Sequence, residues 1–168
     1  AVYTRQTRGE RSLATWLLAD LSQSTDAHAN DHARVIDVIR DALYVFGEAL
    51  NAVGDPFAVW GFSSVRRQHV RMQCIKGLDE PWNDAARARV GAIRPGYYTR
   101  MGAAIRDATR RLAERPERQR LLLVLTDGKP NDIDIYEGRY GLEDTRHAIQ
   151  EARAQGLSPF CVTIDQEA

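Results

Sequence analysis

The stretch LATWLLADLSQS, residues 13–24, decides the fold. Its first nine residues are apolar except for Thr15 and, near the end, Asp20, and such a run is typical of a parallel strand buried on both faces. Polar residues follow at once, where the chain leaves the sheet. Because open α/β sheets bind ligands beyond the carboxyl ends of their strands, the sequence predicts a functional site directly after Leu21.

Strands and helices alternate along the rest of the chain. The segment 67–76 alternates polar and apolar residues, which indicates an edge strand with one solvated face. Strands separated by helices predict an α/β fold: a doubly wound, mostly parallel, Rossmann-like sheet with an antiparallel edge strand and helices on both faces. The pattern predicts helices over 31–53, 83–90, 99–114 and 143–155, and further strands over 57–62, 67–76, 121–127 and 157–165.

Composition excludes several classes of function. The chain has 168 residues, 43% of them hydrophobic, and 23 basic residues balance 23 acidic ones. This balance predicts no electrostatic attraction to nucleic acid or membranes, and no apolar run is long enough to cross a bilayer. Two cysteines without a metal-binding spacing, Cys74 and Cys161, lead us to expect buried thiols in a reducing compartment. With no signal peptide, a cytoplasmic location is expected.

Oxygen-bearing side chains gather at the predicted ligand edge. Asp20, Ser22 and Ser24 alternate in an extended segment, so their side chains point the same way. The strand over 121–127 brings Asp127 to this edge, and the turn before the third helix supplies the hydroxyl of Thr99. Oxygen ligands of this kind suit Mg²⁺, with Mn²⁺ or Ca²⁺ as alternatives. Zinc is excluded because no histidine or cysteine is among the five.

This combination resembles the metal-ion-dependent adhesion site of von Willebrand factor A (vWA) domains. The D-x-S-x-S motif at residues 20–24 is joined by the downstream Thr99 and by Asp127-Gly128, and the resemblance covers essentially the whole chain. It implies that Ser22, Ser24 and Thr99 bind the metal directly, while Asp20 and Asp127 act largely through water. A carboxylate from a partner protein would fill the open coordination position.

The match looks closer to one branch, the C-terminal domains of NorD-type and CbbO-type proteins. These proteins work with MoxR-class AAA+ ATPases. The resemblance therefore implies a cytoplasmic adaptor that binds a target protein while the ATPase supplies force. It also implies that the chain is not itself an enzyme. The target process would be activation of nitric oxide reductase (NorD-type, favoured) or reactivation of Rubisco (CbbO-type). The matching stretches are DLSQSTD (20–26), GDPFAVWGFSS (54–64), RPGYYTRMGAAIR (94–106) and LTDGKPNDIDIYEGRYGLEDTR (125–146).

The resemblance also implies a domain organisation. Residues 1–168 would form a single vWA domain, the C-terminal part of a longer protein, and the last helix of the family would lie beyond Ala168.

A polar segment over 129–146 is a candidate recognition loop, because loops at the ligand edge tend to carry binding residues. We expect Asp132, Asp134, Tyr136 and Arg139 to contact the partner or the ATPase. A self-packed loop without a binding role is an equal alternative.

Other features have ordinary structural interpretations. Asp20 and the serines after it could cap a helix. His28 and His32 have helical metal-pair spacing but no third ligand, which favours exposed loop residues. Tryptophans 16, 60 and 82 favour packing over a binding platform. Seven arginines favour a solvated face over a docking surface for an acidic partner: Arg100, Arg106, Arg110, Arg111, Arg115, Arg118 and Arg120.

Three competing functions remain. Asp20 and Asp127 could hold Mg²⁺ for phosphoryl transfer, yet no phosphate-binding G-x-x-x-x-G-K-[ST] loop is present and Lys129 is the one lysine near the site. A dinucleotide-binding module is disfavoured because no G-x-G-x-x-G follows the first strand. The lack of a signal peptide and of disulfides disfavours an extracellular adhesive domain.

Overall fold

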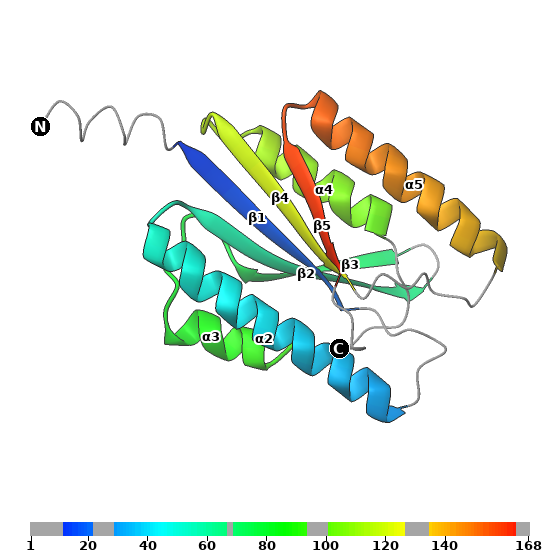
Figure 1. Cartoon of the computed structure of the whole chain (residues 1–168), viewed down its shortest axis with the longest axis horizontal. Coiled ribbons are helices and arrows are strands. Elements are labelled where there is room, and N and C mark those ends of the chain that lie inside the picture. The colour runs from blue at the N-terminus through cyan, green and yellow to red at the C-terminus, as the bar shows by residue number, and fades with distance from the viewer. Residues whose placement is uncertain (1–11, 22–28, 67–68, 94–100, 127–134, 164–168) are drawn as a thin grey trace, which may run out of the picture.

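In the residues that the structure describes, a five-stranded sheet is covered by four helices (Figure 1). The computed structural model describes residues 12–21, 29–66, 69–93, 101–126 and 135–163. The elements in chain order are β1 (Leu13–Asp20), α2 (Ala29–Val53), β2 (Phe57–Arg66), β3 (His69–Lys76), α3 (Asp84–Gly91), α4 (Met101–Ala113), β4 (Gln119–Thr126), α5 (Ile135–Ala154) and β5 (Ser158–Thr163).

The first strand lies at the centre of the sheet, whose order is β3-β2-β1-β4-β5. β1 pairs in parallel with both β2 and β4, and β4 pairs in parallel with β5. β3 is the antiparallel edge strand that its alternating sequence predicts. The doubly wound, mostly parallel fold class is therefore confirmed.

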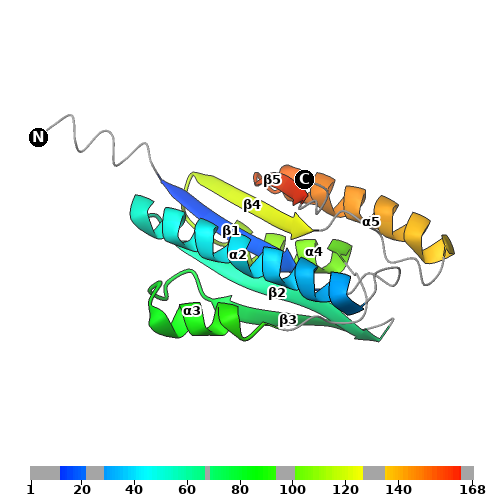
Figure 2. The same ribbon diagram turned by 60° about the horizontal axis from the view of Figure 1, so that its bottom comes forward.

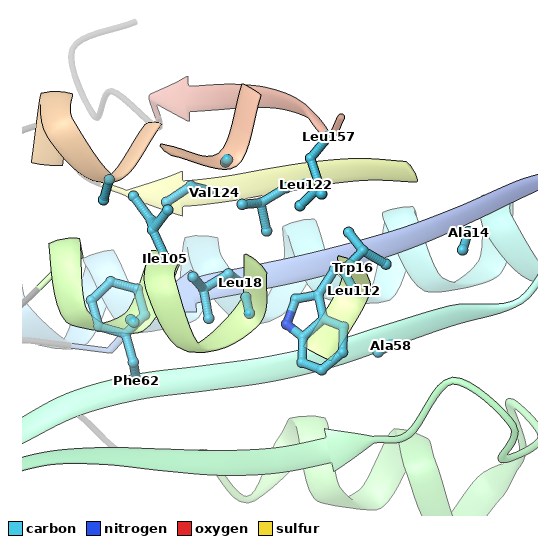
Figure 3. Close-up of a cluster of buried hydrophobic side chains, with 14 residues drawn as sticks. Ala14, Trp16, Leu18, Ala58, Phe62, Ile105, Leu112, Leu122, Val124 and Leu157 are labelled. Carbon is cyan, nitrogen blue, oxygen red and sulfur yellow. The ribbon is translucent and has the colours of Figure 1, made fainter. Parts of the chain in front are cut away.

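One face of the sheet packs against α4 and α5. Even-numbered residues of β1, including Trp16 and Leu18, meet Ile105 and Leu112 of α4 in a buried cluster (Figure 3). Small residues of α5, Ala148 among them, complete this cluster. Alternate residues of a strand point to opposite faces, so the other half of β1 must be buried on the far side.

The far side packs against α2 and α3 (Figure 2). Leu17 and Ala19 of β1 contact a cluster that contains Ile39 and Leu43 of α2 and Val90 of α3. Burial on both faces explains why residues 14 to 19 are uninterrupted by charge, since neither face offers water to a charged side chain.

The cysteines contradict the expectation of buried thiols. Cys74 and Cys161 are both free and exposed. They lie on β3 and β5, the two edge strands, where the covering helices leave side chains accessible. Burial, although incomplete, still raises the pKa of both thiols.

The fourth predicted helix begins earlier than its sequence indicates. We expected a loop over 129–146 and a helix over 143–155, whereas α5 already begins at Ile135. Gly138 and Gly141 disfavour a helix locally, but the alanines of the later turns anchor α5 on the core and the helix extends backwards from them. The prediction of a loop is wrong for residues 135–146.

Two smaller expectations can also be compared with the structure. Trp16 and Trp82 are buried, and Trp60 stacks on Trp16 with ring centroids 5.4 Å apart, so their packing role is confirmed. His32 lies in α2 and not in a loop, while His28 lies outside the described residues. In the part of the chain that the structure describes, no helix is long and apolar enough to span a membrane.

Candidate metal centre

Asp20 ends the central strand at the carboxyl edge of the sheet. Asp20 is only 4% exposed, and its Oδ2 accepts a hydrogen bond from Thr126 Oγ1 at 3.3 Å. Thr126 is the last residue of the neighbouring β4 and is also buried. The structure therefore brings a buried carboxyl group from one strand next to the point where the second strand ends.

The other four predicted ligands lie outside the described residues: Ser22, Ser24, Thr99 and Asp127. Described elements border each of them closely in the chain. β1 ends two residues before Ser22, β4 ends one residue before Asp127, and α4 begins two residues after Thr99. Figure 1 shows that α4 begins at the end of the sheet where β1 and β4 finish.

The chain just before the serines is fixed by a contact that sequence reasoning missed. Leu21 donates a backbone hydrogen bond to Phe62 O at 3.0 Å, which extends the pairing of β1 with β2 by one residue. Its side chain lies over Gly61, where an added Cβ would be 2.4 Å from Leu21 Cδ1. A glycine inside an otherwise apolar strand signals such a close approach.

The donors at this edge fit a hard cation. Asp20, the described residue, carries a carboxyl group. The predicted ligands next to the described elements in the chain carry hydroxyls and a second carboxylate. Oxygen ligands of these kinds are the ones that Mg²⁺ prefers. Among the described residues alone, no group of three or more His, Cys, Asp and Glu side chains could hold a metal.

The predicted partner-binding residues divide into two pairs. Asp132 and Asp134 lie outside the described residues, whereas Tyr136 and Arg139 belong to the first turns of α5. If these two residues bind a partner, they do so from a helix that begins at the carboxyl edge of the sheet (Figure 1), and not from the loop that we expected.

Four of the arginines around α4 pair with acids of the same molecule: Arg106, Arg110, Arg111 and Arg115. Arg110 and Arg111 both contact Asp107 of their own helix, and Arg115 contacts Glu117. The hydrogen bond to Glu117 raises the pKa of Arg115. Their charge is thus offset locally, as expected for a solvated face. Arg100 lies outside the described residues.

A mostly parallel sheet with helices on both faces and a buried carboxyl group at the end of its central strand defines an open, doubly wound α/β domain. The family model of the von Willebrand factor type A domain matches residues 16–168. The chain therefore belongs to the vWA domain family. A solved vWA protein from Catenulispora acidiphila has the same fold, with a TM-score of 0.58 and 21% identity over 88% of this chain and 32% of that chain.

Relatives within the family carry one recurring name. Protein NorD of Stutzerimonas stutzeri is 61% identical over 167 residues, which is 99% of this chain and 27% of that protein. Protein NorD of Brucella suis biovar 1 is 52% identical over 156 residues, 93% of this chain and 24% of that protein. The chain is thus a NorD-like vWA domain that spans about a quarter of the length of these relatives.

Proposed function

We propose that the chain is a metal-dependent protein-binding domain of the NorD type, which works in the cytoplasm with a MoxR-class AAA+ ATPase to activate nitric oxide reductase. The observation that carries this proposal is the 61% identity to a NorD protein over 99% of the chain. The buried carboxyl group of Asp20, at the carboxyl end of the central strand, supplies the second support.

Mg²⁺ would be held by Ser22, Ser24 and Thr99 directly, with Asp20 and Asp127 acting largely through water. The bound ion would supply a positive centre that attracts an anionic group. The domain's own residues then have two tasks: they hold the ion at the edge of the sheet, and they leave one position for an incoming ligand.

The natural ligand for that position is an exposed Asp or Glu of the target protein. Because the direct ligands would be neutral hydroxyls, with both carboxylates acting largely through water, a divalent ion would keep a positive character toward an incoming anion. The first turns of α5, with Tyr136 and Arg139, begin at the same edge and would form a second contact with the target or the ATPase.

The direct test is a pull-down of a MoxR-type ATPase complex and nitric oxide reductase by the full chain. Capture is measured with Mg²⁺, with a chelator, and with Ser22→Ala/Ser24→Ala. We expect capture in Mg²⁺ only, and its loss in the double variant. A matched control is Ser158→Ala, an exposed serine of β5, which should capture as the parent chain does.

Capture that ignores both the chelator and the double variant would overturn the metal-dependent role. Capture of Rubisco instead of nitric oxide reductase would replace the NorD-type target with the CbbO-type one. Mg²⁺-dependent phosphatase or ATPase turnover that disappears in Asp127→Ala would replace the adaptor role with a phosphoryl-transfer enzyme.

A further inference from the structure

The first turn of α4 meets α5 at Gly102, which has no side chain of its own and lies next to Asp144. Gly102 is buried, and a Cβ at this position would lie 2.0 Å from Asp144 Oδ2 and 3.2 Å from Asp144 O. The second of these atoms belongs to the backbone and cannot rotate away. An added side chain would displace the Asp144 carboxyl group and press against the Asp144 backbone, so a glycine suits this close spacing of the two helices.

A single arginine fixes the same junction one turn later. Arg106 Nη2 lies 2.8 Å from Asp144 Oδ1, and Arg106 Nε donates to Glu151 Oε2 at 2.9 Å. The two acids lie seven residues apart on α5, so one planar guanidinium holds two points along the partner helix. Because Oδ1 of Asp144 is bound to Arg106, its other carboxyl oxygen stays over Gly102.

The junction lies between the two segments that lead to the proposed metal ligands. Gly102 follows Thr99 by three residues, and α5 is the element that comes after Asp127 in the chain. Arg110 offers a useful contrast, because it lies on the same helix but pairs with Asp107 of that helix, and so does not connect α4 to α5.

We propose that Arg106, together with Asp144 and Glu151, is a positioning residue for the metal site: it holds the start of α4, and with it the Thr99 turn, at a fixed place relative to α5. This inference rests on the proposed metal site and adds residues that do not themselves bind the metal. A displacement of even about 1 Å in a ligand-bearing turn is costly for Mg²⁺, which demands near-ideal octahedral geometry.

The experiment measures Mg²⁺ and Mn²⁺ affinity of the full chain by titration calorimetry, together with thermal unfolding in chelator. We expect Arg106→Ala to bind the metal about three- to tenfold more weakly, while the melting temperature in chelator changes little because the ion pair is partly exposed. Arg106→Lys keeps the charge but loses the two-point contact, so it should recover only part of the affinity. Arg110→Ala, the matched control, should bind as the parent does.

The outcomes separate this inference from the proposed function. If the parent chain binds metal, and Ser22→Ala/Ser24→Ala abolishes binding while Arg106→Ala stays within twofold of the parent, the positioning role is wrong and the metal site stands. Equal losses in Arg106→Ala and Arg110→Ala would also overturn it, since the second arginine makes no link between helices. If the parent binds no metal, both proposals fail.

Discussion

The hydroxyl of Thr126 donates a hydrogen bond to the carboxyl group of Asp20, and this bond of 3.3 Å joins the ends of two neighbouring parallel strands. Both residues are almost completely buried. The hydrogen bond from β4 thus helps to hold Asp20 in place, in addition to the backbone of its own strand. Both residues end their strands next to the candidate site.

Thr126→Val should destabilise the fold. Valine keeps the shape of threonine but removes the donor, so that the buried carboxyl group loses a partner. The expected fall in the free energy of unfolding is about 1–3 kcal/mol. Urea denaturation followed by circular dichroism measures it, and an unchanged midpoint would mean that the Asp20 carboxyl group does not depend on this bond.

Thr15→Val is the matched control, because the same substitution falls on another buried threonine of the sheet. Thr15 is 0% exposed, and its hydroxyl has no hydrogen-bond partner among the described residues. Removing an unsatisfied hydroxyl should leave stability unchanged or raise it by about 1 kcal/mol. Of the two variants, only Thr126→Val should therefore lower the denaturation midpoint.

Magnesium should stabilise the folded chain. A ligand that binds only the folded state adds about 2.7 kcal/mol when its concentration is 100 times its dissociation constant. We expect the melting temperature to rise on addition of Mg²⁺ and to fall back to its starting value when a chelator is added. The melting temperature of Ser22→Ala/Ser24→Ala should not respond to Mg²⁺. A rise of the same size in the double variant would place the bound metal elsewhere.

The sequence predicts the core of the fold well because local pattern and burial agree there. The apolar run of β1 could be recognised from its composition, and its central place agrees with burial on both faces. The carboxyl edge followed from the same run, since strands of a parallel sheet end together. Asp20 could therefore be proposed as a site residue before any contact was known.

The parts that could not be predicted depend on contacts between distant segments. Thr126 supports Asp20 across 106 positions of sequence, and no local pattern announces that pairing. The thiol of Cys161 is exposed because β5 lies at the edge of the described sheet, a consequence of strand order. The early start of α5 has the same origin, because its later turns pack on the core and override two local glycines.

Gly47→Ala should destabilise the chain although it replaces a glycine inside a helix. This substitution normally stabilises a helix by about 1 kcal/mol. Here the added Cβ would lie 2.5 Å from Cη2 and Cζ2 of Trp82, a buried ring that packs against Phe57. Overpacking of this kind costs about 1–3 kcal/mol. The free energy of unfolding from urea titration, with tryptophan fluorescence as the signal, decides the sign.

A smaller ring at position 82 should relieve that clash. In a Trp82→Phe background, Gly47→Ala is expected to cost less than it does alone, so the double variant should be destabilised by less than the sum of the two single variants. Additive effects of the two substitutions would mean that the cost of the alanine comes from a source other than the ring.

Lys76 should make the stability of the chain depend on alkaline pH. The residue is 2% exposed, and its Nζ donates to Phe57 O and, at 2.9 Å, to Gly77 O, with the ring of Phe57 beneath it. Burial lowers the pKa of Lys76, and the neighbouring acids Glu80 and Asp79 offset this only in part.

Between the lowered pKa of Lys76 and the ordinary value of 10.5, the unfolded chain binds more protons than the folded chain. Unfolding then becomes less favourable as pH rises, because the penalty of burying the charged amine disappears on deprotonation. Relative to Lys76→Met, the parent chain should gain stability as pH rises from neutral toward 10.5, and the difference should level off above that value. Urea titrations of both proteins at several pH values measure the difference between their free energies of unfolding. If the parent chain gains no stability relative to Lys76→Met as pH rises, this account of Lys76 is wrong.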